Sequence, residues 1–119
     1  MKITIINLQS KVPVNSKKVV KTVQKVLSQE GIKKSGEITL SFVNDRKIKK
    51  LNLKYLGKNN PTDVIAFDTA EPKTAEKIFA DIVISTDRAI DNAATFKTTP
   101  LFELYLYVIH GVLHILGYD

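Results

Sequence analysis

Hydrophobic and polar positions along the chain follow two periods, one typical of strands and one typical of helices. Residues 2–8 are rich in β-branched side chains, and apolar residues alternate with polar ones around 38–42, so both segments are predicted strands. Two further strands are predicted at 63–67 and 79–85, joined by a loop or hairpin connection over 68–77. Apolar residues recur at helical spacing in the predicted helices 16–30, 45–56, 85–97 and 101–116. The order β-α-β-α-β-β-α-α predicts an α+β fold, with helices packed on a mixed sheet of about four strands.

The last predicted helix carries the most informative polar residues. Thr99 and Pro100 form a good helix start, with a capping hydroxyl before a proline at the first helical position. Almost every residue from 101 to 116 is apolar or aromatic, so we expect this helix to be buried over most of its circumference. The polar exceptions are Glu103, His110 and His114, which helical spacing places on one stripe together with Tyr107.

The two histidines are candidate metal ligands. Being four residues apart, they project from the same face of a helix, close enough for both imidazoles to reach one metal ion. The alternative is that each histidine is a core residue satisfied by a single hydrogen bond. The chain has no cysteine, so any metal must be held by histidine, aspartate or glutamate.

Length and composition are those of an ordinary globular protein. With 119 residues, the chain is predicted to form a single domain over 1–119. It has no apolar run of membrane-spanning length and no signal-peptide pattern, which predicts a cytoplasmic protein without membrane contact. The net charge of +6 suits a polyanionic partner, although a lysine-rich proteome would give the same balance.

Three motifs stand out in the sequence: Pro61-Thr62-Asp63-Val64-Ile65-Ala66-Phe67, Ala80-Asp81-Ile82-Val83-Ile84-Ser85 and His110-Gly111-x-Leu113-His114-x-x-Gly117-Tyr118-Asp119. Together they resemble the motifs of the YbeY family of bacterial metal-dependent endoribonucleases, which are implicated in ribosomal RNA maturation. The resemblance covers essentially the whole chain. It implies an α+β metal-dependent hydrolase fold, one zinc ion, and a cleft in which RNA meets that metal. It also implies RNA as the partner, above all small-subunit ribosomal RNA with ribosomal components, and we expect a monomer.

The resemblance implies His110 and His114 as zinc ligands. The family's motif ends in a further histidine, its third ligand, which would be residue 120, and the family continues with another helical segment. This chain stops at Asp119 and is expected to lack that segment. The hypothesis is that a carboxylate of Asp119 substitutes for the third ligand, and the alternative is that Asp119 is only the family's turn residue. Glu103 is a candidate catalytic residue that could orient an imidazole, or else a carboxylate that favours the helix dipole.

A second departure from the family lies in the segment Tyr55-Leu56-Gly57-Lys58. The family usually has an arginine at the position of Leu56. A guanidinium can pair bidentately with a phosphate, and leucine cannot. Lys54 and Lys58 are candidate RNA-binding residues, with a merely solvated basic face as the alternative.

Two functions therefore remain open at the level of the sequence. One is a zinc-dependent endoribonuclease of ribosomal RNA. The other is a member of the same fold that binds RNA or the ribosome but has impaired chemistry, because Leu56 and the absent histidine disable it. A metalloprotease is disfavoured, because Gly111 stands where an H-E-x-x-H site requires glutamate.

Overall fold

A mixed four-stranded sheet forms the centre of the computed structural model, which describes residues 1–33, 35–69 and 77–118. The elements are β1 (Lys2–Asn7), α1 (Ser16–Gln29), β2 (Ser35–Val43), α2 (Asp45–Leu56), β3 (Val64–Asp68), β4 (Lys77–Ser85), α3 (Thr86–Phe96) and α4 (Pro100–Ile115). They follow the predicted order, and the predicted α+β class is confirmed. Most of the predicted connection over 68–77 lies outside the described residues.

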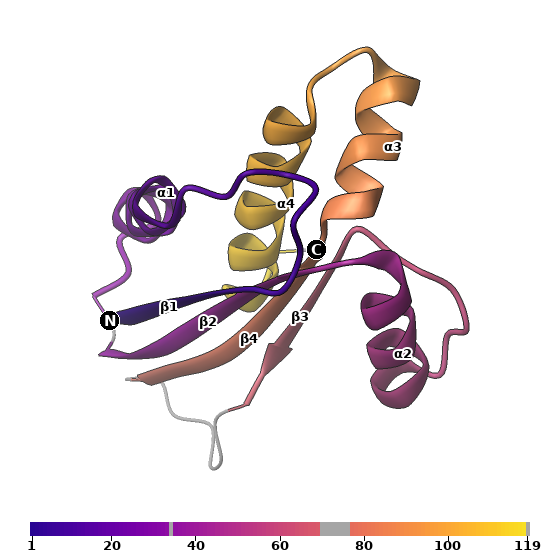
Figure 1. Ribbon diagram of the computed structural model, residues 1–119. Helices are drawn as coiled ribbons and strands as arrows, with labels where there is room; N and C mark the ends of the chain where they lie inside the picture. The colour runs from indigo at the N-terminus through magenta and orange to yellow at the C-terminus, as the bar shows by residue number, and fades with distance from the viewer. Residues whose placement is uncertain (34, 70–76, 119) are drawn as a thin grey trace.

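The strand order across the sheet is β1-β2-β4-β3. β1, β2 and β4 run parallel to one another, whereas β3 pairs antiparallel with β4 and forms one edge. The pairing of β3 with β4 continues beyond β3, because the Thr69 backbone N–H donates to the Phe79 carbonyl oxygen at 2.7 Å. This order places β4 in the interior of the sheet; α3 follows directly from its carboxyl end and leads back to α4 (Figure 1).

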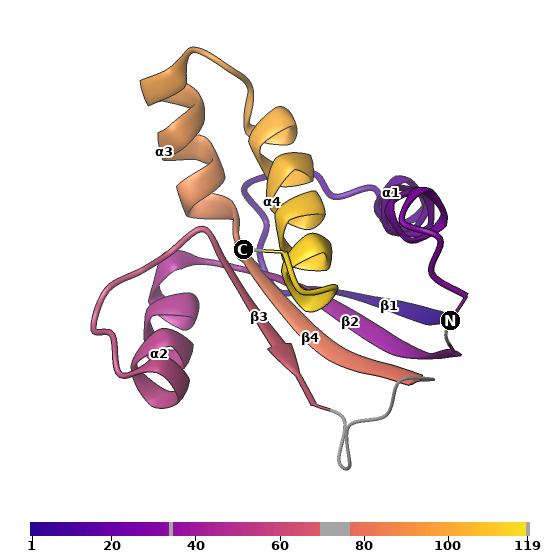
Figure 2. The ribbon, with the colours of Figure 1, turned by 180° about the vertical axis from the view of Figure 1, so that it is seen from behind.

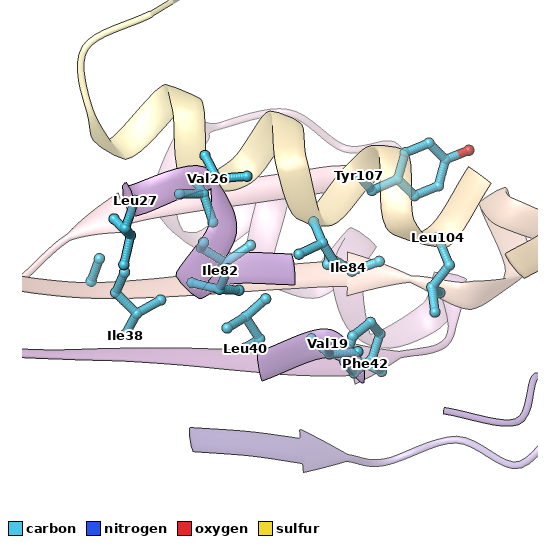
Figure 3. Close-up of a cluster of buried hydrophobic side chains, with 14 of the residues drawn as sticks. Val19, Val26, Leu27, Ile38, Leu40, Phe42, Ile82, Ile84, Leu104 and Tyr107 are labelled. Atoms are coloured by element: carbon cyan, nitrogen blue, oxygen red, sulfur yellow. The ribbon is translucent and has the colours of Figure 1, made fainter. Parts of the chain in front are cut away.

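Helices α1 and α4 cover one face of the sheet and form the main core (Figures 1 and 2). Alternate residues of a strand point to the same face, and the even-numbered positions of β2 and β4 meet these helices. Figure 3 shows this cluster, in which side chains of the two strands point toward apolar residues of α1 and α4. Its fully buried members include Val19, Leu40, Phe42, Ile82 and Leu104.

The opposite face of the sheet carries a smaller core beneath α2. Ile48 of α2 packs with Val43, Ile65 and Val83, which are odd-numbered positions of β2, β3 and β4. Figure 2 shows α2 on the side of the sheet opposite to α4. The last residues of α2 therefore reach the β3 edge from one side, while the carboxyl end of α4 reaches the same edge from the other.

The burial of α4 corrects the expectation that most of its circumference is covered. Its buried residues, including Leu104, Val108 and Val112, form one face, whereas Phe102 and both histidines are exposed. The helix is covered by the sheet, α1 and α3, and its remaining side faces solvent. No helix in the described ranges is long and apolar enough to cross a membrane.

The amino ends of α2 and α3 are joined by a network of charged side chains at the carboxyl ends of β2 and β4. The Arg88 guanidinium contacts the Asp45 carboxylate at 2.8 Å and also pairs with Asp91. Asp87 accepts a hydrogen bond from the Asp45 backbone N–H at 2.8 Å and pairs with Lys11 at 2.9 Å. The network fixes the start of α3 against the start of α2.

Candidate active site

Helix α4 holds the two candidate metal ligands on adjacent turns. The Thr99 hydroxyl caps its start by accepting a hydrogen bond from the Phe102 backbone N–H at 3.1 Å, with Pro100 in the first turn. After its end, Gly117 adopts φ +99°, a conformation that favours glycine. The chain then turns back, because the Tyr118 N–H donates to the Leu113 carbonyl oxygen at 3.0 Å. His110 and His114 thus project from a helix with a defined beginning and end.

The polar stripe on α4 is divided into a buried half and an open half. Glu103 and Tyr107 are buried, whereas His110 and His114 are exposed. The alternative that these are core histidines is therefore wrong. The reason lies in the neighbours of the helix, since its first turns pack against α3 and its last turns pass over β3. The imidazoles are consequently accessible to an ion or a substrate.

Both histidines line a single open cavity of about 440 Å³ at the β3 edge of the sheet. β3 contributes Val64 and Ala66 to the wall, and α2 contributes Leu56, its last residue. Tyr118, which follows α4, completes this part of the wall. The cavity therefore joins two imidazoles with a mostly apolar lining drawn from α2, β3 and the end of the chain's last helix.

The donor set of the described residues fits two positions of a zinc site. Neutral imidazole nitrogens are common zinc ligands, and both histidines line the same cavity. A catalytic zinc ordinarily has three protein ligands, and no group of three His, Cys, Asp or Glu side chains suited to a metal exists within the described residues. Asp119, the predicted substitute for the third ligand, lies outside them, so its role stays a prediction.

Glu103 does not belong to this cavity. Its carboxylate accepts a hydrogen bond from the Thr98 hydroxyl at 2.8 Å, and the side chain is buried in the first turn of α4. A carboxylate there also complements the positive end of the helix dipole. These contacts favour the alternative role at the helix start over the predicted role of orienting an imidazole.

Tyr107 occupies the middle of the stripe and is fixed by contacts with α3. Its hydroxyl accepts a hydrogen bond from the Asn92 side-chain amide at 2.6 Å. Burial is the main cause that raises the pKa of the Tyr107 hydroxyl above its ordinary value. Tyr107 is therefore a neutral link between α3 and α4 at the covered end of the stripe.

The predicted RNA-binding lysines lie in the last turn of α2 and just after it, and neither is among the residues that line the cavity. Lys54 Nζ lies 5.1 Å from the centre of the Tyr55 ring. The Lys58 backbone N–H donates to the Asn52 carbonyl oxygen at 3.3 Å, and the buried Asn52 amide donates to the Asn60 carbonyl oxygen at 2.9 Å. Both lysine side chains are exposed, and the residue between them that does reach the cavity is Leu56.

Sequence reasoning did not identify the contact between Tyr118 and Glu30. In the sequence, Tyr118 belongs to the closing motif and Glu30 ends a predicted helix. In the structure, the Tyr118 hydroxyl donates to Glu30 Oε2 at 2.7 Å, across a separation of 88 residues. No periodicity in the sequence indicates such a contact, because it depends on how α1 and α4 lie side by side on the sheet.

Comparison with known proteins agrees with this arrangement. A family model described as "Endoribonuclease YbeY" matches residues 4–119. A protein of that name from Petrotoga mobilis is 40% identical over 119 residues, covering 100% of this chain and 80% of the relative. The one from Syntrophus aciditrophicus is 39% identical over 122 residues, covering 100% of this chain and 76% of the relative.

A solved structure shares the fold. The solution structure of TM1509 from Thermotoga maritima superposes with a TM-score of 0.62 at 29% sequence identity, over 98% of this chain and 73% of the other. The similarity therefore covers the sheet together with the helix that carries the histidines. The chain belongs to the Endoribonuclease YbeY family.

Proposed function

We propose that this protein is a zinc-dependent endoribonuclease that processes ribosomal RNA during ribosome maturation. The observation that carries the proposal is the pair of exposed imidazoles, His110 and His114, which line the same cavity. The chain that holds them has the fold of an endoribonuclease family. The substrate is small-subunit ribosomal RNA, met in the cytoplasm by a monomer. The activity for which the family is named supports cleavage of RNA, whereas the metal and the ribosomal substrate are parts of the proposal.

The chain's own residues supply position and charge for this chemistry. A zinc ion held by His110 and His114 would polarise a phosphate oxygen and lower the pKa of a bound water. Helix α4 fixes the spacing of the two imidazoles, because they stand one turn apart on a capped helix packed on the sheet. Exposed lysines on α2 and just after it, including Lys54 and Lys58, place positive charge beside the cavity, where phosphates of the RNA would pass.

We propose a carboxylate of Asp119 as the third ligand. Its support is chemical, because carboxylate oxygens complete many catalytic zinc sites that have two histidines. Asp119→Asn is expected to weaken zinc binding, and a histidine appended after Asp119 is expected to change the affinity. An unchanged affinity in Asp119→Asn would exclude the side chain as a ligand.

A second candidate function has specific support as well. Leu56 lines the cavity at the position where the family usually has an arginine, so no guanidinium fork stands there to pair with phosphate. The described residues also supply only two metal-type ligands at this cavity. Both observations favour a protein that binds RNA on the same surface and cleaves it slowly.

The test of the proposed function is cleavage of a small-subunit ribosomal RNA transcript by wild-type protein and by His114→Ala. Cleavage that requires zinc and is lost in His114→Ala would support the enzyme. RNA binding without cleavage, in both proteins, would favour the binding function. Cleavage that persists in a metal-free His114→Ala preparation would point to a contaminating nuclease instead of this site.

A further inference from the structure

Tyr118 forms part of the wall of the histidine cavity while remaining open to solvent. The residue lines the cavity together with His110 and His114, and 54% of its surface is exposed. An aromatic ring that is both exposed and next to a candidate cleavage site is suited to stacking, because every nucleobase presents a flat π-face.

Two hydrogen bonds fix this ring in place. The Tyr118 hydroxyl donates to Glu30 Oε2 at 2.7 Å, and its backbone N–H donates to the Leu113 carbonyl oxygen at 3.0 Å. Glu30 immediately follows α1, so the first of these bonds ties the segment after α4 to a different helix. A ring held at both ends is arranged for a ligand before the ligand arrives, which lowers the ordering cost of binding.

The rest of the cavity wall is apolar next to the ring. Val64 and Ala66 come from β3 and Leu113 from α4, and Leu56 adds a side chain that is 51% exposed. A ribose-phosphate backbone would gain little from such a lining, since its oxygens need hydrogen-bond donors or positive charge. A nucleobase has an apolar face, and the cavity of about 440 Å³ falls within the size of ordinary small-molecule sites.

We infer that the cavity is a nucleobase subsite, in which a base adjacent to the cleaved phosphate stacks on Tyr118 against the apolar wall that includes Leu56. Glu30 is a positioning residue, which acts by holding the tyrosine ring. Leu56 makes this part of the wall apolar, so this subsite discriminates by stacking rather than by charge. The inference rests on the proposed function, because it requires RNA to be bound at the histidine cavity.

The test compares two short single-stranded RNAs with 2′-O-methyl riboses, one carrying all its bases and one in which every base is absent. Binding is measured by fluorescence anisotropy with wild-type protein and with Tyr118→Ala. Stacking on an aromatic side chain is worth about 1–3 kcal/mol per base, so Tyr118→Ala is expected to weaken binding of the base-carrying RNA by about fivefold or more. Its affinity for the abasic RNA should stay within about twofold of wild type, because the phosphate contacts are unchanged.

Two further sets of variants sharpen this comparison. Phe102→Ala is the matched control, since Phe102 is 57% exposed on the first turn of the same helix and does not line the cavity. It should leave both affinities unchanged. Tyr118→Phe and Glu30→Ala keep the ring and remove its hydrogen bond to Glu30, so each should weaken binding of the base-carrying RNA by about threefold or less. The double variant should be no weaker than either single one, because both remove the same bond.

Equal affinity of wild-type protein for the two RNAs would overturn the subsite, and this measurement needs no variant. Equal loss of affinity for both RNAs in Tyr118→Ala would overturn it too. If wild-type protein binds neither RNA but still cleaves ribosomal RNA, the subsite is wrong and the proposed function stands. If the base-dependent binding is observed without any cleavage, the subsite is supported and the proposed catalysis fails.

Discussion

At the scale of single residues, Gly111 shows why the position between the histidines is a glycine. A Cβ atom built at Gly111 would lie 2.6 Å from Ile82 Cγ2 and 3.3 Å from Val64 Cγ2. The absent side chain therefore lets α4 lie directly on β4 at the turn that carries His110. The same contact excludes a glutamate at this position, which agrees with the sequence argument against an H-E-x-x-H protease.

Gly111→Ala is expected to lower the free energy of unfolding by about 1–3 kcal/mol, since the Ile82 methyl group and the helix must move apart. The measurement is urea denaturation followed by circular dichroism. His114→Ala is the control on the same helix, where substitution of an exposed residue should change stability by less than about 0.5 kcal/mol. A Gly111→Ala protein as stable as wild type would show that α4 can shift freely on the sheet.

At the scale of elements, the junction of α2 and α3 links stability to pH. The pKa of Asp87 is lowered, first because its carboxylate accepts a hydrogen bond from the Asp45 backbone N–H, and then because Lys11 donates to it. The folded protein thus binds a proton at Asp87 less tightly than the unfolded chain does. The stability due to this carboxylate is complete above its ordinary pKa and is lost as pH falls through the lowered value.

We therefore expect the free energy of unfolding to fall as the pH drops below about 4. Asp87→Asn should lower stability by roughly 1 kcal/mol at neutral pH and should reduce this acid dependence. The exposed Asp81 of β4 provides the matched control. Asp81→Asn should leave both the stability at neutral pH and its acid dependence nearly unchanged. Denaturation curves at several acidic pH values measure the effect, and an equal acid dependence in wild type and Asp87→Asn would contradict it.

The helices and strands themselves could be predicted from the sequence, because period, caps and glycine stops are local features. Thr99, Pro100 and the alternation around Leu40 were sufficient for α4 and β2. Which residues of the α4 stripe are buried could not be predicted, because Glu103 and His110 share a face of the helix and differ only in what packs on them. That depends on the positions of α3 and β3, which are set by contacts distant in sequence.

At the scale of the whole molecule, the net charge of +6 predicts salt-dependent RNA binding. The order β1-β2-β4-β3 brings the end of α2 to the histidine cavity. Helix α1 approaches the cavity wall through Glu30, which contacts Tyr118, and the first turn of α1 lies at the opposite end of the helix from Glu30. Charge near the cavity should matter more than the same charge at a distance, although both helices carry several lysines.

Substitution of three α2-side lysines, Lys50, Lys54 and Lys58, by glutamine should weaken RNA binding and reduce its salt dependence. The slope of log K against log salt should become shallower by up to about 0.7 for each phosphate of single-stranded RNA that a lysine no longer neutralises. The matched control replaces Lys17, Lys18 and Lys21 of α1, with the same change in net charge, and should have a smaller effect. Equal effects would indicate that only net charge matters.

The most direct test of the central claim is a zinc titration of the untagged protein by calorimetry. The chain contains two histidines and no cysteine, so strong imidazole binding can come only from His110 and His114. We predict one zinc ion per chain. His110→Ala and His114→Ala should each weaken zinc binding by more than the roughly 10–100-fold expected for loss of a residue that only hydrogen-bonds a metal ligand. Unchanged zinc affinity when both histidines are replaced by alanine would contradict the metal site.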